Sequence, residues 1–305
     1  MWIKLKKLCI FLLFILFVGC SNDTNSSIEQ NIVPNEKRAQ GYSLGLYNSN
    51  STIEAERSFD IKDEIFEKNI IFTNKTNQDR VFILLVFDNG KQRNFKIHDN
   101  DMRYFRFTLA KNQSETIPVK IEGITDGFHA TNFIILKNPD EVVTDSNTLA
   151  KADSLSQTYN IRVNLFKNLD KIPMERPQQV NSEKLKEARI DGIFVGKQGD
   201  AYKALLQTED DNLRFNVLYG NLSEESIDFY IVSLVDWEQV NINSNQNIYD
   251  KLAKGENKKI TVSIDNKKNG KVMILFMLTN PFSPLPDDNP YTASPNASFK
   301  VKLID

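Results

Sequence analysis

Cysteine and histidine are scarce in this chain of 305 residues, which contains two of each. Cys9 and Cys20 could form at most one disulfide, so the sequence excludes the disulfide-stapled scaffolds of small secreted proteins. No Cys or His spacing typical of zinc ligands occurs, and neither a metal site nor a cofactor is predicted. Stability is therefore expected to come from the burial of apolar side chains.

An excess of basic residues is also lacking. Lys and Arg number 38 against 40 Asp and Glu, which gives a formal charge of −2. No lysine-rich block alternates with aromatic residues, so nucleic acid is not an expected partner. The chain has no phosphate-binding glycine loop and no paired-carboxylate motif, and we find no enzyme in the sequence.

Long hydrophobic runs are missing as well. The apolar run Leu8–Val18 has 11 residues, which is too short for a permanent membrane-spanning helix of about 20 residues. Lys4, Lys6 and Lys7 give it a positive start. A positive start before a short apolar run is typical of a secretory signal.

The end of this run carries a recognisable motif. It reads "FVGC", with Gly19 before Cys20, and polar residues follow. This resembles the signal of bacterial lipoproteins, although Phe17 stands where that family usually has leucine. The resemblance implies a signal peptide at 1–19, a diacylglyceryl group on Cys20, and a flexible tether over 20–40. The protein would then be lipid-anchored at the extracytoplasmic face of a bacterial cell membrane. The alternative is an ordinary signal peptide or a membrane anchor with a chance cysteine.

Most other apolar residues come in short runs rich in β-branched and aromatic types, such as "VFILLVF" and "TNFIIL". Polar clusters separate these runs at intervals of roughly ten residues, which is typical of an antiparallel β-sandwich or barrel. Ile117, Val119 and Ile121 fall on one side of a strand and predict one buried face. Short helices are expected only at Ser146–Gln157 and Ser182–Ile190.

Several segments of the first half reappear in the second half in the same order. Their separation falls from 147 to 138 residues along the chain, as expected if the loops of the second copy are shorter. The pairs are "NIIFTNKT" at Asn69 with "NVLYGNLS" at Asn216, "LAKNQSETIPVKI" at Leu109 with "LAKGENKKITVSI" at Leu252, and "YNIRVNL" at Tyr159 with "ASFKVKL" at Ala297. The sequence therefore predicts a tandem duplication of one β domain.

The duplication sets the expected domain boundaries. The first domain would cover 41–166 and the second 191–305, with a linker at 167–190 that contains a short helical segment. The repeated pattern L-A-K-[NG]-x-x-x-x-I-x-V-x-I resembles the strand-turn-strand of extracellular immunoglobulin-like modules. The predicted fold class is therefore all-β, with two tandem immunoglobulin-like antiparallel β-sandwich domains that arise from an internal duplication.

The stretch "GYSLG" at Gly41–Gly45 matches the Gly-x-Ser-x-Gly pattern of a serine nucleophile, which makes a hydrolase using Ser43 one alternative. A nucleophile elbow needs a buried strand before it and a helix after it. Neither "NEKRAQ" before it nor "LYNSNSTIEAE" after it fits that context. The duplication also aligns Ser43 with Phe194, an apolar residue in an expected first strand. Ser43 is interpreted as structural, and no catalytic residue is predicted.

Other polar clusters have modest interpretations. The segment His98–Asp101 offers oxygen and nitrogen ligands, but no calcium-loop pattern follows, and the second copy has "NINSNQN" in its place. Glu209–Asn212 is a similar acidic turn, interpreted as solvated. His129 is expected to be a surface or capping histidine. Trp237 is either an exposed aromatic anchor or a core residue, and its apolar flanks favour the core.

Two long loops are the best candidates for binding. They follow Pro139 and Pro281, at the same position of the two copies. Long loops at the end of a rigid sandwich often carry binding functions, and proline lowers the entropy lost when such a loop is ordered. The alternative is a long crossover that covers an open edge of the core. The candidate binding residues of the second loop are Phe282, Pro284, Pro286 and Tyr291.

Together these observations favour a non-catalytic envelope lipoprotein. Its partners would be the membrane, through lipid on Cys20, and an unidentified extracytoplasmic protein or cell-wall glycan bound by an interaction or scaffold module. One alternative is a lipoprotein that sequesters a ligand or peptide, of the immunity or transporter-associated type. The other alternative is the serine hydrolase that uses Ser43.

Overall fold

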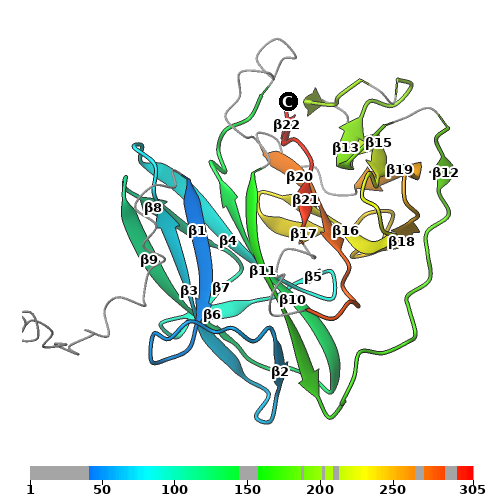
Figure 1. The fold of residues 1–305 in the computed structure, drawn as a ribbon. Helices are drawn as coiled ribbons and strands as arrows, with labels where there is room; N and C mark the ends of the chain where they lie inside the picture. The colour runs from blue at the N-terminus through cyan, green and yellow to red at the C-terminus, as the bar shows by residue number, and fades with distance from the viewer. Residues whose placement is uncertain are drawn as a thin grey trace, which may run out of the picture. The chain divides into compact units, whose positions relative to one another are not determined.

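All regular structure in this protein is β-structure wherever it can be described. The structure is a computed structural model that describes residues 41–143, 157–186, 189–200, 203–208, 213–264, 271–285 and 294–304. Among these residues every regular element is a β-strand (Figure 1). The signal, Cys20 and the tether lie outside the described residues, as do residues 146–156 of the first expected helix.

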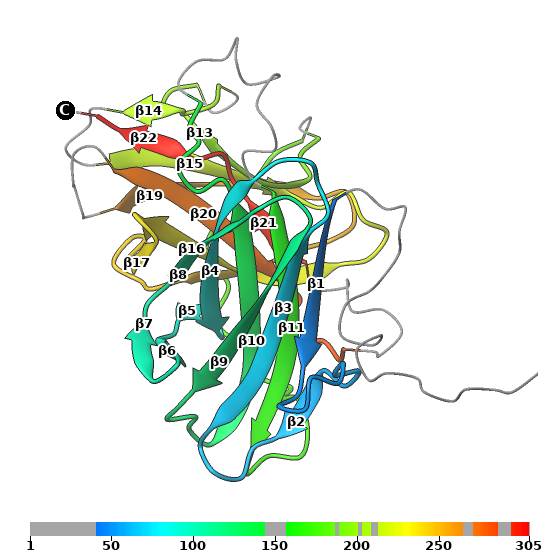
Figure 2. The ribbon, with the colours of Figure 1, turned by 90° about the vertical axis from the view of Figure 1, so that its left-hand side faces the viewer.

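The first half of the chain forms a sandwich of two sheets. Its strands are β1 (Tyr42–Tyr47), β2 (Ser58–Asp60), β3 (Phe66–Asn74), β4 (Arg80–Asp88), β5 (Lys91–Gln92), β6 (Phe95–Ile97), β7 (Asn100–Met102), β8 (Phe105–Leu109), β9 (Gln113–Ile121), β10 (Gly127–Lys137) and β11 (Thr158–Lys167). One sheet has the order β1-β3-β9-β6-β7 (Figure 2). The facing sheet has the order β2-β11-β10-β4-β5, and β8 also pairs with β4.

The second half forms another pair of sheets. Its strands are β12 (Glu183–Lys184), β13 (Gly192–Gly196), β14 (Gln207–Thr208), β15 (Leu213–Gly220), β16 (Ile227–Val235), β17 (Glu238–Val240), β18 (Ile248–Leu252), β19 (Asn257–Ile264), β20 (Val272–Thr279), β21 (Asn296–Ala297) and β22 (Val301–Leu303). One sheet has the order β12-β19-β15-β13, and the other has the order β14-β22-β20-β16-β17. In addition, β18 pairs with β16 and β21 pairs with β20.

The two halves share one topology, which confirms the predicted duplication. In the first half β1 lies in one sheet and the short strand β2 lies in the other sheet. In the second half β13 and the short strand β14 are arranged in the same way. Each short strand pairs in parallel with the last strand of its half, as β2 does with β11 and β14 with β22, while the other pairs are antiparallel. This is an immunoglobulin-like sandwich. The predicted fold class is therefore confirmed.

Matching turns repeat the duplication at the level of single atoms. Asn74 Nδ2 donates to the carbonyl oxygen of Gln78 at 2.8 Å, and Asn221 Nδ2 donates to that of Glu225 at 2.7 Å. Each asparagine Oδ1 also accepts a hydroxyl hydrogen bond of 2.6 Å from the residue two positions on. Asparagine side chains favour such turns because they bond to the nearby backbone.

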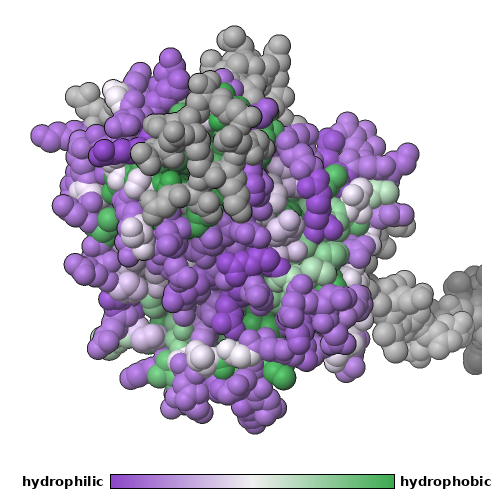
Figure 3. All heavy atoms as spheres, turned by 180° about the vertical axis from the view of Figure 1, so that it is seen from behind, coloured by the Kyte–Doolittle hydropathy of each residue, from purple (hydrophilic) through white to green (hydrophobic). Residues whose placement is uncertain are grey.

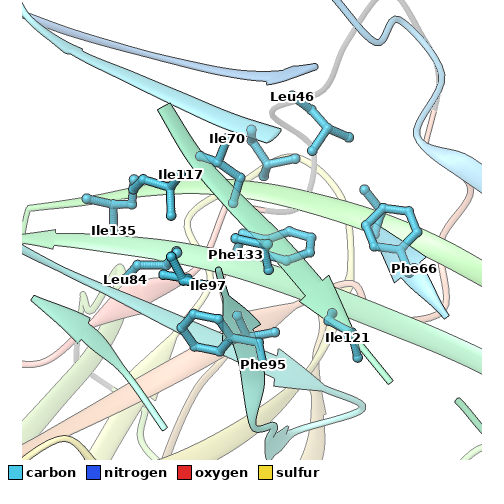
Figure 4. Close-up of a cluster of buried hydrophobic side chains, with 14 of the residues drawn as sticks. Leu46, Phe66, Ile70, Leu84, Phe95, Ile97, Ile117, Ile121, Phe133 and Ile135 are labelled. Carbon is cyan, nitrogen blue, oxygen red and sulfur yellow. The ribbon is translucent and has the colours of Figure 1, made fainter. Parts of the chain in front are cut away.

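Each sandwich has its own apolar core. In the first, Phe133 of β10 lies across from Ile117 and Ile121 of β9, with Phe66 and Phe95 beside them (Figure 4). The inward residues of β9 are those that the sequence predicted, since their burial alternates along the strand. Burial of each such side chain stabilises the fold by about 1.5–3 kcal/mol.

A third apolar cluster joins the two sandwiches, so that Lys37–Asp305 is one compact unit. Its members come from the outer faces of the β4–β10 sheet in the first half and the β16–β20 sheet in the second. These strands are therefore buried on both faces, which is why their sequences are apolar throughout and do not alternate. The buried residues of this cluster are Ile83, Leu85, Phe87, Ile134, Leu136, Tyr230, Val232, Leu234, Trp237, Tyr249, Ile274, Phe276 and Leu278.

Two buried cations cross between the sandwiches in equivalent ways. Arg162 of β11 donates to the carbonyl oxygens of Asn280 and Ser283, just after β20. Lys300, the equivalent residue of the second half, donates to the carbonyl oxygens of Asn138 and Pro139, just after β10. Each half thus supplies a cation to the turn that begins the long loop of the other half.

The linker runs along the second sandwich in extended form. Its strand β12 pairs with β19 and places Glu183 opposite Lys259, with an ion pair of 2.9 Å between them. The expectation of a helix at Ser182–Ile190 is therefore wrong at Glu183–Lys184. Pairing with an open sheet edge satisfies more backbone groups than one isolated turn of helix could, because such short helices are marginal in water.

Candidate functional site

Ser43 is the second residue of edge strand β1 and lies opposite Thr73 of β3. The strand continues to Tyr47 with no turn into a helix, so the strand-turn-helix context of a catalytic serine is missing here. Ser43 Oγ is buried and has no hydrogen-bond partner among the described residues. The equivalent residue, Phe194, also lies in an edge strand, β13. This geometry supports the structural interpretation of Ser43.

His98 and Asp99 form the two-residue turn of the β6–β7 hairpin. Their φ angles are 47° and 65°, both positive as a type I′ turn requires. Asn243 and Ser244 form the same turn in the second half, with φ of 48° and 65°. The geometry of a tight hairpin thus explains the backbone conformation of His98 and Asp99. Within the described parts of the chain, no group of three or more His, Cys, Asp or Glu could hold a metal ion. Glu209–Asn212 lies outside those parts.

His129 is buried, so the expectation of a surface or capping histidine is wrong. It lies on β10. The Nδ1 atom of His129 is 2.8 Å from Asp88 Oδ2, and its Nε2 atom is 2.9 Å from the carbonyl oxygen of Thr125. Burial lowers the pKa of the imidazole, but the Asp88 carboxylate and the Thr125 carbonyl outweigh this and raise that pKa above its ordinary value. Both acceptors favour the doubly protonated ring, which is held as part of the structure.

Trp237 is 8% exposed and belongs to the cluster between the sandwiches, which confirms its interpretation as a core residue. It takes a left-handed φ of 72°, and the equivalent Gly90 has a φ of 73°. A tryptophan in this conformation is strained, so the packing between the sandwiches must compensate for that strain.

The first residue of the predicted binding loop after Pro281, Phe282, packs against aromatic residues of both sandwiches. The Phe282 ring is half-buried and lies 6.0 Å from Phe128 of the first half, 6.2 Å from Tyr230 and 6.1 Å from Tyr249, measured between centroids. Pro284 is exposed. Pro286 and Tyr291 lie outside the described residues, so binding by this loop stays a prediction.

A charged hollow of about 590 Å³ lies beside the linker on the second sandwich. Its walls come from the linker, the start of β16, the end of β18 and the turn into β19. Ile227 supplies its apolar part, and its partner across β16 and β18, Leu252, is buried in the core beneath. The remaining lining residues are Arg176, Gln179, Lys184, Ser226, Asp228, Lys251, Ala253, Glu256 and Lys258.

The two carboxylates of the hollow are already engaged by the protein. Asp228 Oδ2 accepts the Tyr249 hydroxyl at 2.8 Å and is 3.8 Å from Arg176 Nε. Glu256 accepts the Ala253 backbone N–H at 2.9 Å, and its other oxygen is 2.7 Å from Lys184 Nζ. Burial raises the pKa of the Glu256 carboxyl, but Lys184 and the Ala253 N–H outweigh it and lower that pKa below its ordinary value.

The four cations of the hollow differ in how they are held. Lys258 Nζ is buried and is 3.0 Å from Asp250 Oδ1. The Arg176 guanidinium lies over the Phe282 ring at 4.5 Å, so the hollow adjoins the start of the predicted loop. The Lys251 ammonium is exposed and has no partner among the described residues, and the Lys184 side chain is 76% exposed. Lys184 and Lys251 are therefore the cations turned toward solvent, and Lys184 is paired with Glu256.

A second hollow, of about 410 Å³, lies along edge strand β13. Phe194, Leu218 and Phe299 line it, and among its described lining residues Arg189 and Asp191 are the only charged ones. Since these two charges are opposite, nothing in this hollow selects one class of ligand.

Figure 3 shows one face of the molecule, on which hydrophilic side chains predominate and hydrophobic ones are in small separate areas. Polar recognition is thus the chemistry that this face offers.

The part of the chain that the structure describes contains no helix long and apolar enough to cross a membrane. No family model matches the chain, and no curated protein matches it.

Three solved structures show remote similarity. The Salmonella enterica SafA pilin in complex with the SafB chaperone is 10% identical over 80% of this chain and 93% of that chain, with a TM-score of 0.26. Red sea bream transglutaminase is 10% identical over 88% of this chain and 32% of that chain, at 0.23. The Acinetobacter baumannii CsuC–CsuE chaperone and tip adhesion subunit complex is 7% identical over 86% and 100%, at 0.23. At these scores none of the three supports an argument about this chain.

Proposed function

We propose that this protein is a non-catalytic lipoprotein of the bacterial envelope that binds an extracytoplasmic protein or cell-wall glycan. Lipid on Cys20 holds it at the membrane, and the joined sandwiches act as the interaction module. The signal-like N-terminus supports the anchor, since two acyl chains hold a protein stably on a membrane surface. The position of Ser43 within a continuous strand supports a function without catalysis.

The observation that carries the binding function is the charged hollow. It combines a concave surface, two cations turned toward solvent and an apolar contribution from the partly exposed Ile227. Ligand sites are concave and combine apolar walls with a few placed polar groups, within volumes of about 300–1,000 Å³. The same volume favours a second candidate function, the sequestration of a short peptide.

Pulldown from intact cells tests the proposal. The wild-type chain is expected to be retained in the membrane fraction and to capture an extracytoplasmic partner. Cys20→Ala is expected to be shed into the medium, because it lacks the acyl anchor. Retention of Cys20→Ala in the membrane would contradict lipid anchoring. A soluble peptide as the main captured species would favour sequestration over a scaffold.

A further inference from the structure

We infer that the charged hollow binds an acidic peptide segment, whose carboxylates meet Lys251 and Lys184. This inference rests on the proposed function and names the chemistry of its partner. The described lining residues include four cations and two carboxylates, and Asp250 beside the hollow pairs with Lys258, so this group carries a net positive charge of one, which belongs to Lys251. The chain as a whole is slightly acidic, so this local charge is set by the residues gathered here.

Within the hollow the two carboxylates are more buried than the ammonium groups of Lys184 and Lys251. Asp228 and Glu256 have side chains that are 14% and 16% exposed, and each accepts hydrogen bonds from the protein. A ligand that enters from solvent first meets the exposed ammonium groups of Lys184 and Lys251. An anionic ligand therefore gains attraction there, whereas a cationic ligand is repelled.

Two of the cations are positioned in advance. Arg176 is stacked on Phe282, bonds to the carbonyl oxygen of Pro173 and lies beside Asp228. Lys258 Nζ donates to the carbonyl oxygen of Lys251 at 2.7 Å as well as to Asp250. Side chains that are already ordered lose less entropy when a ligand binds. The exposed Lys251 side chain thus adjoins two ordered cations, each paired with a carboxylate of the protein.

The lining favours a peptide over a sugar chain. Its described residues include no aromatic one, and the nearby Phe282 ring already has the Arg176 guanidinium over it. The hollow thus offers no open ring face to the apolar side of a sugar. Carboxylates suit its cations, and Gln179 and Ser226 offer amide and hydroxyl groups to a peptide backbone.

The lysines of the hollow are not repeated at the equivalent described positions of the first half, despite the duplication. Arg80 pairs with Leu109 in the first half as Ile227 pairs with Leu252 in the second. The alignment that follows puts Val81, Thr108 and Glu115 where the second half has Asp228, Lys251 and Lys258. Lys251 and Lys258 therefore have no cationic counterparts in the first half, and binding is expected with a stoichiometry of one peptide per chain.

The probe for this inference is a fluorescein-labelled hexaglutamate peptide, followed by fluorescence anisotropy on the full chain at low salt. One-to-one binding that weakens as salt is added is expected, since salt screens exposed charges. Lys184→Glu with Lys251→Glu is expected to weaken binding by roughly tenfold or more. The matched control, Lys62→Glu with Lys302→Glu, makes the same change of net charge at exposed lysines outside the hollow and should bind as the wild type does.

Equal weakening by both double variants would overturn the inference, since overall charge would then explain the binding. Failure of hexaglutamate to bind, or a preference for an anionic cell-wall polymer over it, would overturn it as well. The pulldown from intact cells separates this inference from the proposed function. Capture of the same partner by wild type and by Lys184→Glu with Lys251→Glu would refute the acidic-peptide site only. Capture of no partner by the wild type would refute the proposed function.

Discussion

The backbone N–H of Gln92 donates to Gln239 Oε1 at 2.6 Å, and the backbone N–H of Gln239 donates to Gln92 Oε1 at 2.7 Å. The side-chain amide nitrogens of both glutamines also donate hydrogen bonds to backbone carbonyls of the opposite half. Gln92 Nε2 donates to the carbonyl oxygen of Trp237 at 2.7 Å, and Gln239 Nε2 donates to that of Gly90 at 3.0 Å. Because β5 and β17 are equivalent strands, the contact is self-complementary, like that across the axis of a two-fold dimer.

Gln92→Ala or Gln239→Ala is expected to lower the free energy of unfolding by about 1–3 kcal/mol, because each change leaves a backbone N–H of its partner without an acceptor. The double variant should lose less than the two single variants lose together, since the bonds are shared. Urea unfolding of the three variants and the wild type measures both effects. Strict additivity would mean that the two glutamines do not act as one contact.

Lys300 gives a stability that rises with alkaline pH. Burial lowers the pKa of its ammonium to about 8 from 10.5, against the smaller opposing effect of Glu141 and Asp140. Between these values the unfolded chain binds more protons than the folded chain, so stability increases as pH rises. Relative to Lys300→Met, the wild type should gain on the order of 1–3 kcal/mol between about pH 7.5 and 10.5. Parallel pH profiles from urea unfolding would contradict this.

His129 gives the opposite dependence. The carboxylate of Asp88 holds its folded pKa above 6.5, so the stabilisation is fully present below the unfolded pKa of about 6.5. It is lost as pH rises through the folded pKa. The difference in free energy of unfolding between wild type and His129→Gln should therefore shrink from acidic to alkaline pH. A difference that stays constant from about pH 5.5 to 8.5 would show that the ring does not titrate with folding.

Substitution of Phe282 measures how much the start of the predicted loop contributes to the stability of the fold. Phe282→Ala is expected to destabilise the fold by about 1–3 kcal/mol, less than a fully buried phenylalanine, because the ring is half-buried between the sandwiches. Pro284→Ala, an exposed neighbour, should stay within about 0.5 kcal/mol of the wild type. Thermal or urea unfolding compares them. Similar stability for the two variants would mean that the ring packing contributes little.

Ser43→Ala should keep or slightly raise stability, by up to about 1 kcal/mol, because the buried hydroxyl has no partner to lose. Any binding activity should be unchanged. A serine-reactive fluorophosphonate probe should not label Ser43 in the wild type. Labelling at Ser43 that is abolished in the variant would restore the hydrolase alternative.

Much of the fold could be predicted from the sequence because the duplication is written in it. Segments such as those at Asn69 and Asn216 keep their order, and the alternation of Ile117, Val119 and Ile121 marks a half-buried strand. The packing between the sandwiches also has a signal in the sequence. In "VFILLVF" and "FYIVSLV" both faces are apolar, which indicates two buried faces where a solvated sheet would alternate.

Other features depend on contacts that no local pattern records. The strand β12 arises from pairing with β19, some 75 residues later in the chain, which overrides the helical tendency of "SEKLKEARI". Burial of His129 depends on Asp88, 41 residues earlier, which the β4–β10 pairing places beside it. The charged hollow likewise gathers Arg176, Lys184 and Lys251 from separate segments, and each of them is unremarkable in the sequence.

The reciprocal contacts of Gln92 with Gln239, and of Arg162 and Lys300 with the opposite turns, bear on how the junction between the two halves responds to substitution. A face whose contacts are reciprocal is self-complementary, which is the property that lets two identical sandwiches pair about a two-fold axis. Within one polypeptide such a face ties the two halves to each other: a substitution at Gln92 or Gln239 removes contacts from both sides of the junction at once.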